Sequence, residues 1–472
     1  MVPLARRAKI VATLGPASIN QVPALVRAGL DVARFNMSHG SIGTHERAYD
    51  IVRRASDESG HSVGVLVDLQ GPKIRVGKFA GGSNRLRKGS NFTICTDQVE
   101  GDEKHVGVSY SALPQDVSKG DRLLLDDGNL VLEVTGTTDT EVRCTVVVGG
   151  KISDHKGLNV PGAALSVPAL SDKDADDLRW ALRLRADMIA LSFVRSAEDL
   201  QPVHRIMDEI GVRLPVLAKL EKPQAVDELD AVVNAFDGLM VARGDLGVEL
   251  PLEEVPLVQK RAVELARERS KPVVVATQVL ESMITSPRPT RAEASDAANA
   301  VLDGADALML SAETSVGEYP VESVSMMSRI IAAAEEGLDR LPPLRTPPQT
   351  QGGAIATAAA SVGAVVGAKF LVAFTQSGDT ARRLARHRNP IPLLAFTPVP
   401  SVRSQLSLVW GVETFIVPEV KTTDEMVRQV DGALRGLGRC QPGDKIVVVA
   451  GSPPRTPGST NALRVWTIGT AI

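Results

Sequence analysis

Charged and polar residues follow short apolar runs at several places in this chain, and their spacing is suited to chemistry. Lys219 and Glu221 follow one such run. On an extended strand residues i and i+2 point to the same side, so the two side chains share a side. A salt bridge at a strand end would explain this pair alone. The preceding Leu217-Ala218 implies partial burial, however, and a buried lysine without a partner is costly.

A second carboxylate, Asp245, lies in a Gly-Asp-Leu-Gly turn after another apolar run. Two carboxylates with room left for water and phosphate oxygens suit Mg²⁺, or Mn²⁺ in its place, better than zinc or calcium. With Lys219, Arg34 and Arg75 as cations, such a site would accept an anionic, phosphorylated substrate. Phosphoryl transfer is the chemistry these parts support, because it depends on positioning and charge neutralisation.

The elements that must position these residues are predicted by hydrophobic periodicity. Apolar runs alternate with longer amphipathic segments, which indicates parallel strands joined by crossover helices. The predicted strands are residues 9–14, 31–36, 63–69, 188–193, 215–220, 238–243, 272–277 and 305–310. Eight β/α units are what a closed TIM (β/α)8 barrel requires, and the charged residues follow the strand ends that form the active-site face of this fold.

The segment after the third strand has a different pattern. Short alternating strands are predicted at 92–95, 122–126, 130–135 and 141–148, without helical periodicity. This pattern predicts a small antiparallel β-barrel domain, placed to act as a lid. A proline-rich linker at 341–348 precedes a separate open α/β domain. The expected domains are residues 1–70 and 168–340 for the barrel, 71–167 for the lid and 341–472 for the C-terminal domain.

Composition narrows the class of protein. The 472 residues carry 53 Lys plus Arg against 56 Asp plus Glu, a net charge of -3, which argues against a nucleic-acid or membrane-surface binder. Three cysteines without metal or disulfide spacing, and an N-terminus without a signal-peptide pattern, predict a cytoplasmic protein. No Walker A or protein-kinase glycine loop is present.

The sequence closely resembles pyruvate kinase along essentially its whole length. The resemblance is carried by seven motifs in order: RFNMSHG (34–40), DLQGPKIR (68–75), KGLNVPG (156–162), AKLE (218–221), MVARGDLGVELP (240–251), ATQVLESM (276–283) and LSAETSVGEYP (310–320). It implies the final step of glycolysis, in which phosphoenolpyruvate and ADP give pyruvate and ATP. It also implies a homotetramer with a mobile lid and a regulatory C-terminal domain.

The resemblance also implies roles for single residues. Lys219 would stabilise the phosphoryl group in transfer, Arg34 would bind it, and Glu221 with Asp245 would hold the divalent ion. Backbone groups of Gly244 and Asp245, with the Thr277 hydroxyl, would bind the substrate carboxylate, and Thr277 with water would relay a proton to the enolate carbon. The remaining implied contacts are the pocket walls Ser192 and Phe193 and the nucleotide-binding residues Asn36, His39, Arg75 and Lys156.

One departure from the family concerns potassium. Family members that require K⁺ usually carry Thr and Glu where this chain has Leu69 and Lys73. The ion site of those enzymes corresponds here to Asn36, Ser38 and Asp68. Because Lys73 brings a fixed positive charge to the same place, we expect K⁺ to be dispensable, although weak occupancy or modest stimulation stays open.

The C-terminal domain contains a candidate effector site. A strand is followed by a hydroxyl-rich turn that opens a helix, an arrangement that cradles phosphate. The candidate residues are Thr375, Ser377, Gly378 and Thr380, with Arg455 from a later loop. An ordinary helix cap is the simpler alternative. Asp379 adds negative charge, which disfavours fructose bisphosphate and leaves a monophosphorylated sugar and a nucleotide equally open.

Two other functions compete with this interpretation. A Mg²⁺-dependent lyase or aldolase barrel acting on pyruvate or phosphoenolpyruvate would use the same carboxylates, but it needs neither Lys156 on a lid nor a C-terminal domain. A non-catalytic metabolite sensor could keep the fold. Retention of Lys219, Glu221 and Thr277 argues against a sensor, because such a protein is free to lose them.

Overall fold

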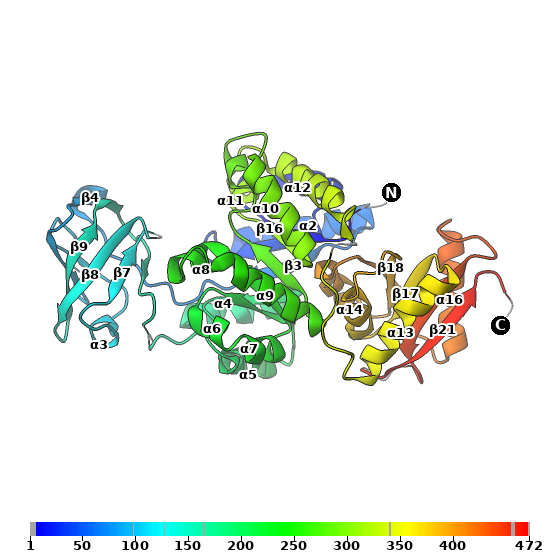
Figure 1. Ribbon diagram of the computed structural model, residues 1–472. Coiled ribbons are helices and arrows are strands. Elements are labelled where there is room, and N and C mark those ends of the chain that lie inside the picture. The colour runs from blue at the N-terminus through cyan, green and yellow to red at the C-terminus, as the bar shows by residue number, and fades with distance from the viewer. Residues whose placement is uncertain are drawn as a thin grey trace.

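The computed structural model describes residues 6–97, 99–126, 128–163, 166–338, 341–454 and 458–470. Three bodies follow one another in Figure 1, with a β domain at one end, a barrel in the middle and an α/β domain at the other end. The predicted TIM (β/α)8 barrel and C-terminal open α/β domain are confirmed. The inserted β domain lies at one side of the barrel and the α/β domain at the other.

Eight parallel strands close the central barrel in the order β1-β16-β15-β14-β13-β12-β3-β2. They are β1 (Lys9–Thr13), β2 (Val32–Asn36), β3 (Gly64–Asp68), β12 (Met188–Leu191), β13 (Val216–Leu220), β14 (Gly238–Ala242), β15 (Val273–Ala276) and β16 (Ala307–Leu310). Each corresponds to a predicted strand, with ends moved by one or two residues. Nearly every strand residue is buried, which explains the continuous apolar runs of the sequence.

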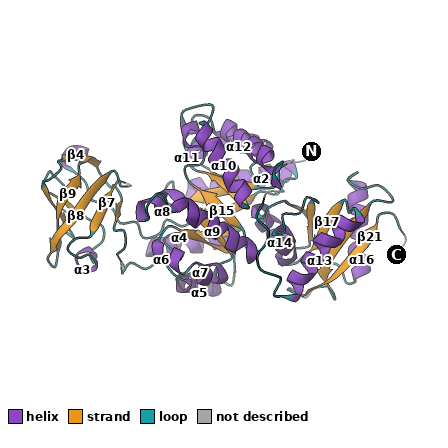
Figure 2. Ribbon diagram, viewed as in Figure 1, coloured by secondary structure: helices purple, strands orange, loops and turns teal. Residues whose placement is uncertain are grey.

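Helices surround the barrel strands in Figure 2. They include α1 (Val22–Ala28), α2 (Ile42–Ser59), α4 (Asp172–Leu184), α5 (Leu200–Ile210), α7 (Leu229–Ala235), α9 (Val255–Glu268), α10 (Arg291–Asp303) and α12 (Pro320–Glu335). Three short helices follow strand ends directly: α6 (Pro223–Asp227), α8 (Arg243–Glu249) and α11 (Ala312–Ser315). Capping boxes at Ser171 and Thr290 begin α4 and α10 by satisfying their first free amides.

The inserted β domain has its own hydrophobic core. Its strands are β4 (Ser83–Leu86), β5 (Asn91–Cys95), β6 (His105–Gly107), β7 (Arg122–Leu125), β8 (Leu130–Thr137), β9 (Glu141–Val148), β10 (Gly150–Ser153) and β11 (Leu158–Asn159), with the short helix α3 (Leu113–Asp116). Hydrogen bonding among the described residues makes a six-stranded sheet, β11-β7-β8-β9-β5-β6, and a two-stranded sheet, β10-β4, and does not close a barrel. One pair, β5 with β6, is parallel, because the chain crosses back before β6 begins. The four strands that the sequence did not predict have only two to four residues each, too few for a clear alternation.

The C-terminal domain is an open α/β sheet, as predicted. Its strand order is β19-β18-β17-β20-β21, and only β21 is antiparallel to its neighbour. The strands are β17 (Phe370–Phe374), β18 (Leu393–Thr397), β19 (Val412–Ile416), β20 (Lys445–Gly451) and β21 (Thr460–Thr467). The helices are α13 (Gln351–Val366), α14 (Asp379–Ala385), α15 (Pro400–Gln405) and α16 (Thr423–Gly436).

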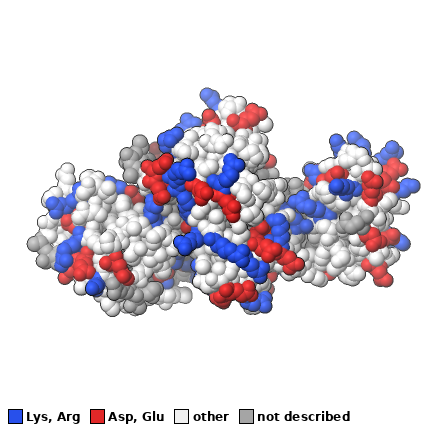
Figure 3. All heavy atoms as spheres, turned by 180° about the vertical axis from the view of Figure 1, so that it is seen from behind, with Lys and Arg blue, Asp and Glu red and all other residues white. Residues whose placement is uncertain are grey.

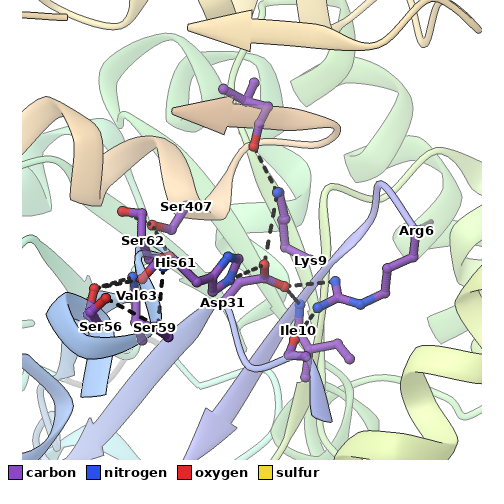
Figure 4. A network of polar contacts seen from close by, with 12 residues as sticks. Arg6, Lys9, Ile10, Asp31, Ser56, Ser59, His61, Ser62, Val63 and Ser407 are labelled. Carbon is purple, nitrogen blue, oxygen red and sulfur yellow. Dashed lines mark hydrogen bonds and ion pairs between the residues drawn. The ribbon is translucent and has the colours of Figure 1, made fainter. Parts of the chain in front are cut away.

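The N-terminal end of the barrel joins this domain through a polar network (Figure 4). Lys9 Nζ donates a hydrogen bond of 2.9 Å to the Val412 carbonyl on β19. The hydroxyls of Ser62 and Ser407 lie 3.1 Å apart across the same junction. The opposite, C-terminal end of the barrel is therefore the end that remains available for a substrate.

On the face drawn in Figure 3, basic and acidic side chains are interspersed, in keeping with their nearly equal numbers in the sequence. The three cysteines, Cys95, Cys144 and Cys440, are free thiols. Within the described ranges, no helix is both long and apolar enough to cross a membrane.

Candidate active site

A recess of about 400 Å³ lies at the C-terminal end of the barrel strands. Its wall includes nine residues singled out from the sequence: Arg34, Asn36, Ser38, Asp68, Lys73, Ser192, Lys219, Asp245 and Thr277. Further lining residues, which the sequence did not indicate as site residues, are Gln70, Met240, Ala242 and Met309. The barrel thus gathers predicted site residues that lie more than 200 positions apart in the chain.

Lys219 at the end of β13 is buried and surrounded by acceptors. Its Nζ lies 2.8 Å from Glu221 Oε1 and 3.3 Å from Asp68 Oδ1, and it donates a 2.7 Å hydrogen bond to Ser192 Oγ. Burial disfavours the ammonium, yet the carboxylates of Asp68, Glu221 and Asp245 together raise the pKa of Lys219 above its ordinary value. Lys219 is therefore a permanent positive charge at the recess.

Arg34 provides a second fixed cation on β2. Its Nε donates to Asp68 Oδ2 at 2.7 Å, and its Nη1 donates to Thr13 Oγ1 at 2.8 Å. Burial alone would raise the pKa of Asp68, but Lys219 and Arg34 lower it below its ordinary value. The sequence suggested Asp68 only as a K⁺ ligand, whereas the structure makes it the shared partner of both cations. Thr13 was not predicted, although its position at a strand end was a usable signal.

Glu221 and Asp245 form the predicted pair of carboxylates. Glu221 is buried, and its Oε2 accepts the Phe193 amide at 2.7 Å. Burial raises the pKa of Glu221, Lys219 opposes that effect, and the nearby Asp245 reinforces it. Within the described residues, no cluster of three or more His, Cys, Asp or Glu side chains could hold a metal. Asp245 lines the recess, whereas Glu221 is buried and does not line it. Carboxylate oxygens beside such a recess fit an ion that keeps water and substrate oxygens, as Mg²⁺ does.

Thr277 is held in an unusual backbone conformation beside α8. Its φ is 66°, a left-handed value that is uncommon for a β-branched residue. Arg243 Nη2 donates to the Thr277 carbonyl at 2.9 Å, and the Gly244 amide donates to the Thr277 hydroxyl at 2.7 Å. These bonds fix the hydroxyl at the wall of the recess.

Three predicted nucleotide-binding residues, His39, Arg75 and Lys156, do not line the recess. Arg75 Nη1 donates to the His155 carbonyl at 2.9 Å, and Lys156 pairs with Asp126 at 2.7 Å, both within the β domain. That domain extends away from the barrel in Figure 1. The positive charge of Arg75 still reaches His39, whose pKa is lowered by burial and then by Lys73, Arg75 and Arg34. The predicted nucleotide site is therefore only partly assembled.

A second recess of about 470 Å³ lies in the C-terminal domain. Thr375, Ser377 and Thr380 line it. The Gly378 amide donates to Thr375 Oγ1 at 3.0 Å, and the hydroxyls of Thr380 and Thr460 lie 2.7 Å apart. The negative charge of Asp379 is offset by Arg383, whose Nε lies 2.6 Å from the carboxylate. The predicted partner Arg455 lies outside the described residues.

Comparison with known proteins identifies the family. The model of the pyruvate kinase barrel domain matches residues 5–324, and the model of the pyruvate kinase alpha/beta domain matches residues 353–466. The chain belongs to the pyruvate kinase family. The pyruvate kinase of Mycobacterium tuberculosis is 58% identical over 468 residues, which cover 99% of each chain, and that of Corynebacterium efficiens is 55% identical over 466 residues, which cover 98% of each. The crystal structure of a pyruvate kinase from Cryptosporidium parvum superposes with a TM-score of 0.90 at 33% identity, over 98% of this chain and 96% of that one.

Membership in the pyruvate kinase family makes the chain a phosphotransferase enzyme of glycolysis. The match extends over both the barrel and the C-terminal domain. The lyase or aldolase alternative is not favoured, because the similarity includes the domains that such an enzyme does not need.

Proposed function

We propose that the residues of this recess transfer the phosphoryl group of phosphoenolpyruvate to ADP, giving pyruvate and ATP. The observation that carries the proposal is the buried Lys219 ammonium between Asp68 and Glu221, at the mouth of a barrel whose opposite end is closed by another domain. A fixed cation in a partly desolvated site stabilises the charge of a transferring phosphoryl group without reorganising.

The other residues have complementary roles in this proposal. Arg34 and Lys219 bind the phosphoryl oxygens from two sides, and Ser192 and Phe193 form the neighbouring wall. Glu221 and Asp245 would hold Mg²⁺, or Mn²⁺, which when bound neutralises charge on the substrate oxygens.

The substrate carboxylate replaces the Thr277 hydroxyl as acceptor of the Gly244 amide and also accepts a hydrogen bond from the backbone amide of Asp245. Thr277, with its hydroxyl already at the wall, then relays a proton through water to the enolate carbon.

Nucleotide binding requires the β domain to move toward the barrel. Asn36 lines the recess and His39 follows it closely on the chain, whereas Arg75 and Lys156 belong to the β domain. Closure over the recess would bring both cations to the nucleotide phosphates and exclude water, which strengthens every charge interaction inside.

We propose that K⁺ is not obligatory. Lys73 lines the recess together with Asn36, Ser38 and Asp68, where its ammonium supplies a positive charge. Activity in potassium-free and sodium-free buffer should approach that measured with added K⁺. Turnover seen only with K⁺ would contradict the proposal.

We propose further that the second recess binds a phosphorylated sugar or a nucleotide and that four copies assemble. The turn formed by Thr375, Ser377, Gly378 and Thr380 supports phosphate binding. Thr380→Ala should remove activation by the effector and leave basal turnover intact.

Sedimentation would test the tetramer, and a monomer at assay concentrations would contradict it.

The decisive test is pyruvate formation from phosphoenolpyruvate and ADP with Mg²⁺, comparing the wild type with Lys219→Met. We expect ADP-dependent turnover that falls by at least about 10²–10³-fold in the variant. Lys260→Met is the control, since Lys260 is exposed and pairs with Asp303 away from the recess. Folded wild type without turnover would instead favour a lyase or a sensor.

A further inference from the structure

We propose that Glu249 is a positioning residue that sets the geometry of the Glu221–Asp245 metal site and the attachment of the β domain together. The inference rests on the proposed function, because it takes Glu221 and Asp245 as the ligands of the divalent ion. Glu249 is not among the residues that line the recess. It acts through two other side chains, Lys222 and Asn159.

Glu249 is a buried carboxylate with two donors from different parts of the chain. Its side chain is 2% exposed, and Oε1 lies 2.6 Å from Lys222 Nζ. The same oxygen accepts a 3.1 Å hydrogen bond from Asn159 Nδ2. Asn159 ends β11, the last strand of the β domain before the chain returns to the barrel. The segment around Asn159, through which the chain returns from the β domain to the barrel, is called here the returning hinge. One carboxylate therefore joins this hinge to the barrel.

Both members of the Lys222–Glu249 ion pair lie close in the chain to the predicted metal ligands Glu221 and Asp245. Lys222 is the residue after Glu221, and Glu249 is the last residue of α8, whose first turn carries Asp245. The Lys222–Glu249 ion pair therefore fixes the end of β13 against the end of α8. A change in this pair would move Glu221 relative to Asp245 without removing either carboxylate.

The segment around Gly71, through which the chain leaves the barrel for the β domain, is the outgoing hinge. It contacts Phe193, which lies beside Lys222. Lys222 Nζ lies 5.5 Å from the centre of the Phe193 ring, and the Phe193 amide is bonded to Glu221. Gly71, at the start of the β domain, has φ +72°, and a Cβ there would lie 2.4 Å from Phe193 Cδ2. Both hinges therefore contact the group formed by Phe193, Lys222 and Glu249.

This arrangement has a physical consequence. Residues that orient metal ligands typically change metal affinity or activity by about 10–100-fold when replaced. Because Asn159 and Lys222 share one oxygen of Glu249, movement of the β domain alters the partner of Lys222 and so the position of Glu221. Closure of the β domain and binding of the divalent ion are coupled through this carboxylate.

The test compares Glu249→Gln, Asn159→Ala and Lys222→Met in the full-length protein. Mn²⁺ affinity is measured by electron paramagnetic resonance of the free ion, without turnover, and KM for ADP and kcat are measured separately. We expect Glu249→Gln to weaken Mn²⁺ binding by about tenfold. Asn159→Ala should raise KM for ADP several-fold, with a smaller effect on kcat. In the double variant that combines Asn159→Ala with Lys222→Met, the fold-changes in Mn²⁺ affinity and in KM for ADP should be smaller than the products of the fold-changes in the single variants. The reason is that both substitutions act through Glu249.

Asn84→Ala is the matched control, because Asn84 belongs to the same β domain and its side chain accepts the Arg85 amide at 2.7 Å within that domain. The proposal is overturned if the Asn159 and Lys222 variants match this control, or if they lower only the melting temperature. The proposal is also overturned if the fold-change in the double variant equals the product of the fold-changes in the Asn159 and Lys222 single variants. If Glu249→Gln does not fold, Asn159→Ala and Lys222→Met still decide the question.

Failure of the proposed function gives a different result. Wild type that forms no pyruvate, or that retains turnover in Glu221→Gln, would contradict the assignment of the metal site itself. Wild type that turns over, with Glu221→Gln inactive and Asn159→Ala unchanged, would contradict only the role of Glu249.

Discussion

The two ends of the barrel each bury charged residues around an aspartate, but they satisfy those charges differently. At the N-terminal end, Asp31 Oδ2 lies 2.7 Å from Arg6 and 2.8 Å from the Ile10 amide, while Oδ1 lies 3.3 Å from His61 and 3.9 Å from Lys9 (Figure 4). Burial alone would raise the pKa of Asp31, but Arg6 and then Lys9 hold it well below its ordinary value.

At the C-terminal end the balance is incomplete. Asp68 is paired with Lys219 and Arg34, yet burial keeps the pKa of Glu221 raised, and Asp245 adds to that effect. A further cation would relieve the repulsion between the two carboxylates. The comparison shows that the aspartate at the domain junction is held ionised by the cations around it, whereas at the recess one of two neighbouring carboxylates keeps a raised pKa, which suits that end to bind a cation and an anionic substrate.

The largest expected effect is on stability at the N-terminal end. Asp31→Asn would leave Arg6 and Lys9 buried without their counter-charge, which should cost about 3–5 kcal/mol of unfolding free energy. Urea unfolding measures this change, and kcat of the folded protein should be unaltered. Asp208→Asn is the control, because its ion pair with Arg213 is exposed and worth at most about 1 kcal/mol. An equal loss in both variants would show that the Asp31 cluster is not structural.

The equivalent change at the C-terminal end should act on catalysis. Asp68→Asn removes the charge that holds both Lys219 and Arg34, so kcat should fall by about 10²–10³-fold. We expect its stability loss to be smaller than that of Asp31→Asn, because Asp68 borders the open recess. Steady-state assays and urea unfolding measure the two quantities. Near-normal kcat with a large loss of stability would remove the distinction between the two ends.

A smaller effect is expected at the contact between the domains. Lys9→Met removes a charged hydrogen bond to Val412, which should cost about 1.5–3 kcal/mol. Calorimetry should show a lower melting temperature for Lys9→Met and an unchanged one for Lys260→Met. Equal melting temperatures in the two variants would mean that Lys9 does not secure the junction.

The smallest effect is a pH dependence beside the same junction. Burial, followed by Arg386 and Arg267, lowers the pKa of His387 to about 4. A base with a lowered pKa in the folded state contributes stability above its unfolded pKa of about 6.5 and loses it as pH falls toward 4. Because His387 is half-buried, we expect a loss of only about 1 kcal/mol over this range. His387→Gln should flatten the curve of unfolding free energy against pH, and an unchanged slope would contradict this assignment.

Much of the active site could be predicted because strand ends are local features of the sequence. Each barrel strand is a continuous apolar run, and the residue types that follow it are visible directly, as with Lys219 and Glu221. The parallel barrel then brings these ends to one face, so nine predicted residues share one recess. The short strands of the β domain were missed, because two to four residues give no periodicity.

Contacts between distant segments could not be predicted in the same way. The sequence does not show that Asp68 partners both Lys219 and Arg34, because that depends on which strands are neighbours across the barrel. Lys156 is paired with Asp126 within the β domain, and its distance from the recess depends on the orientation of that whole domain. The link between Glu249 and Asn159 likewise joins residues 90 positions apart.

The sequence alone determined the fold class, the family resemblance and the types of residue at the active-site end, because periodicity and strand-end chemistry are written in short segments. Only the tertiary structure decided in which of two buried charge clusters the central aspartate is held ionised and in which a carboxylate keeps a raised pKa. That difference depends on distances between side chains from separate strands, and charge interactions in a buried site change strongly with a few ångströms.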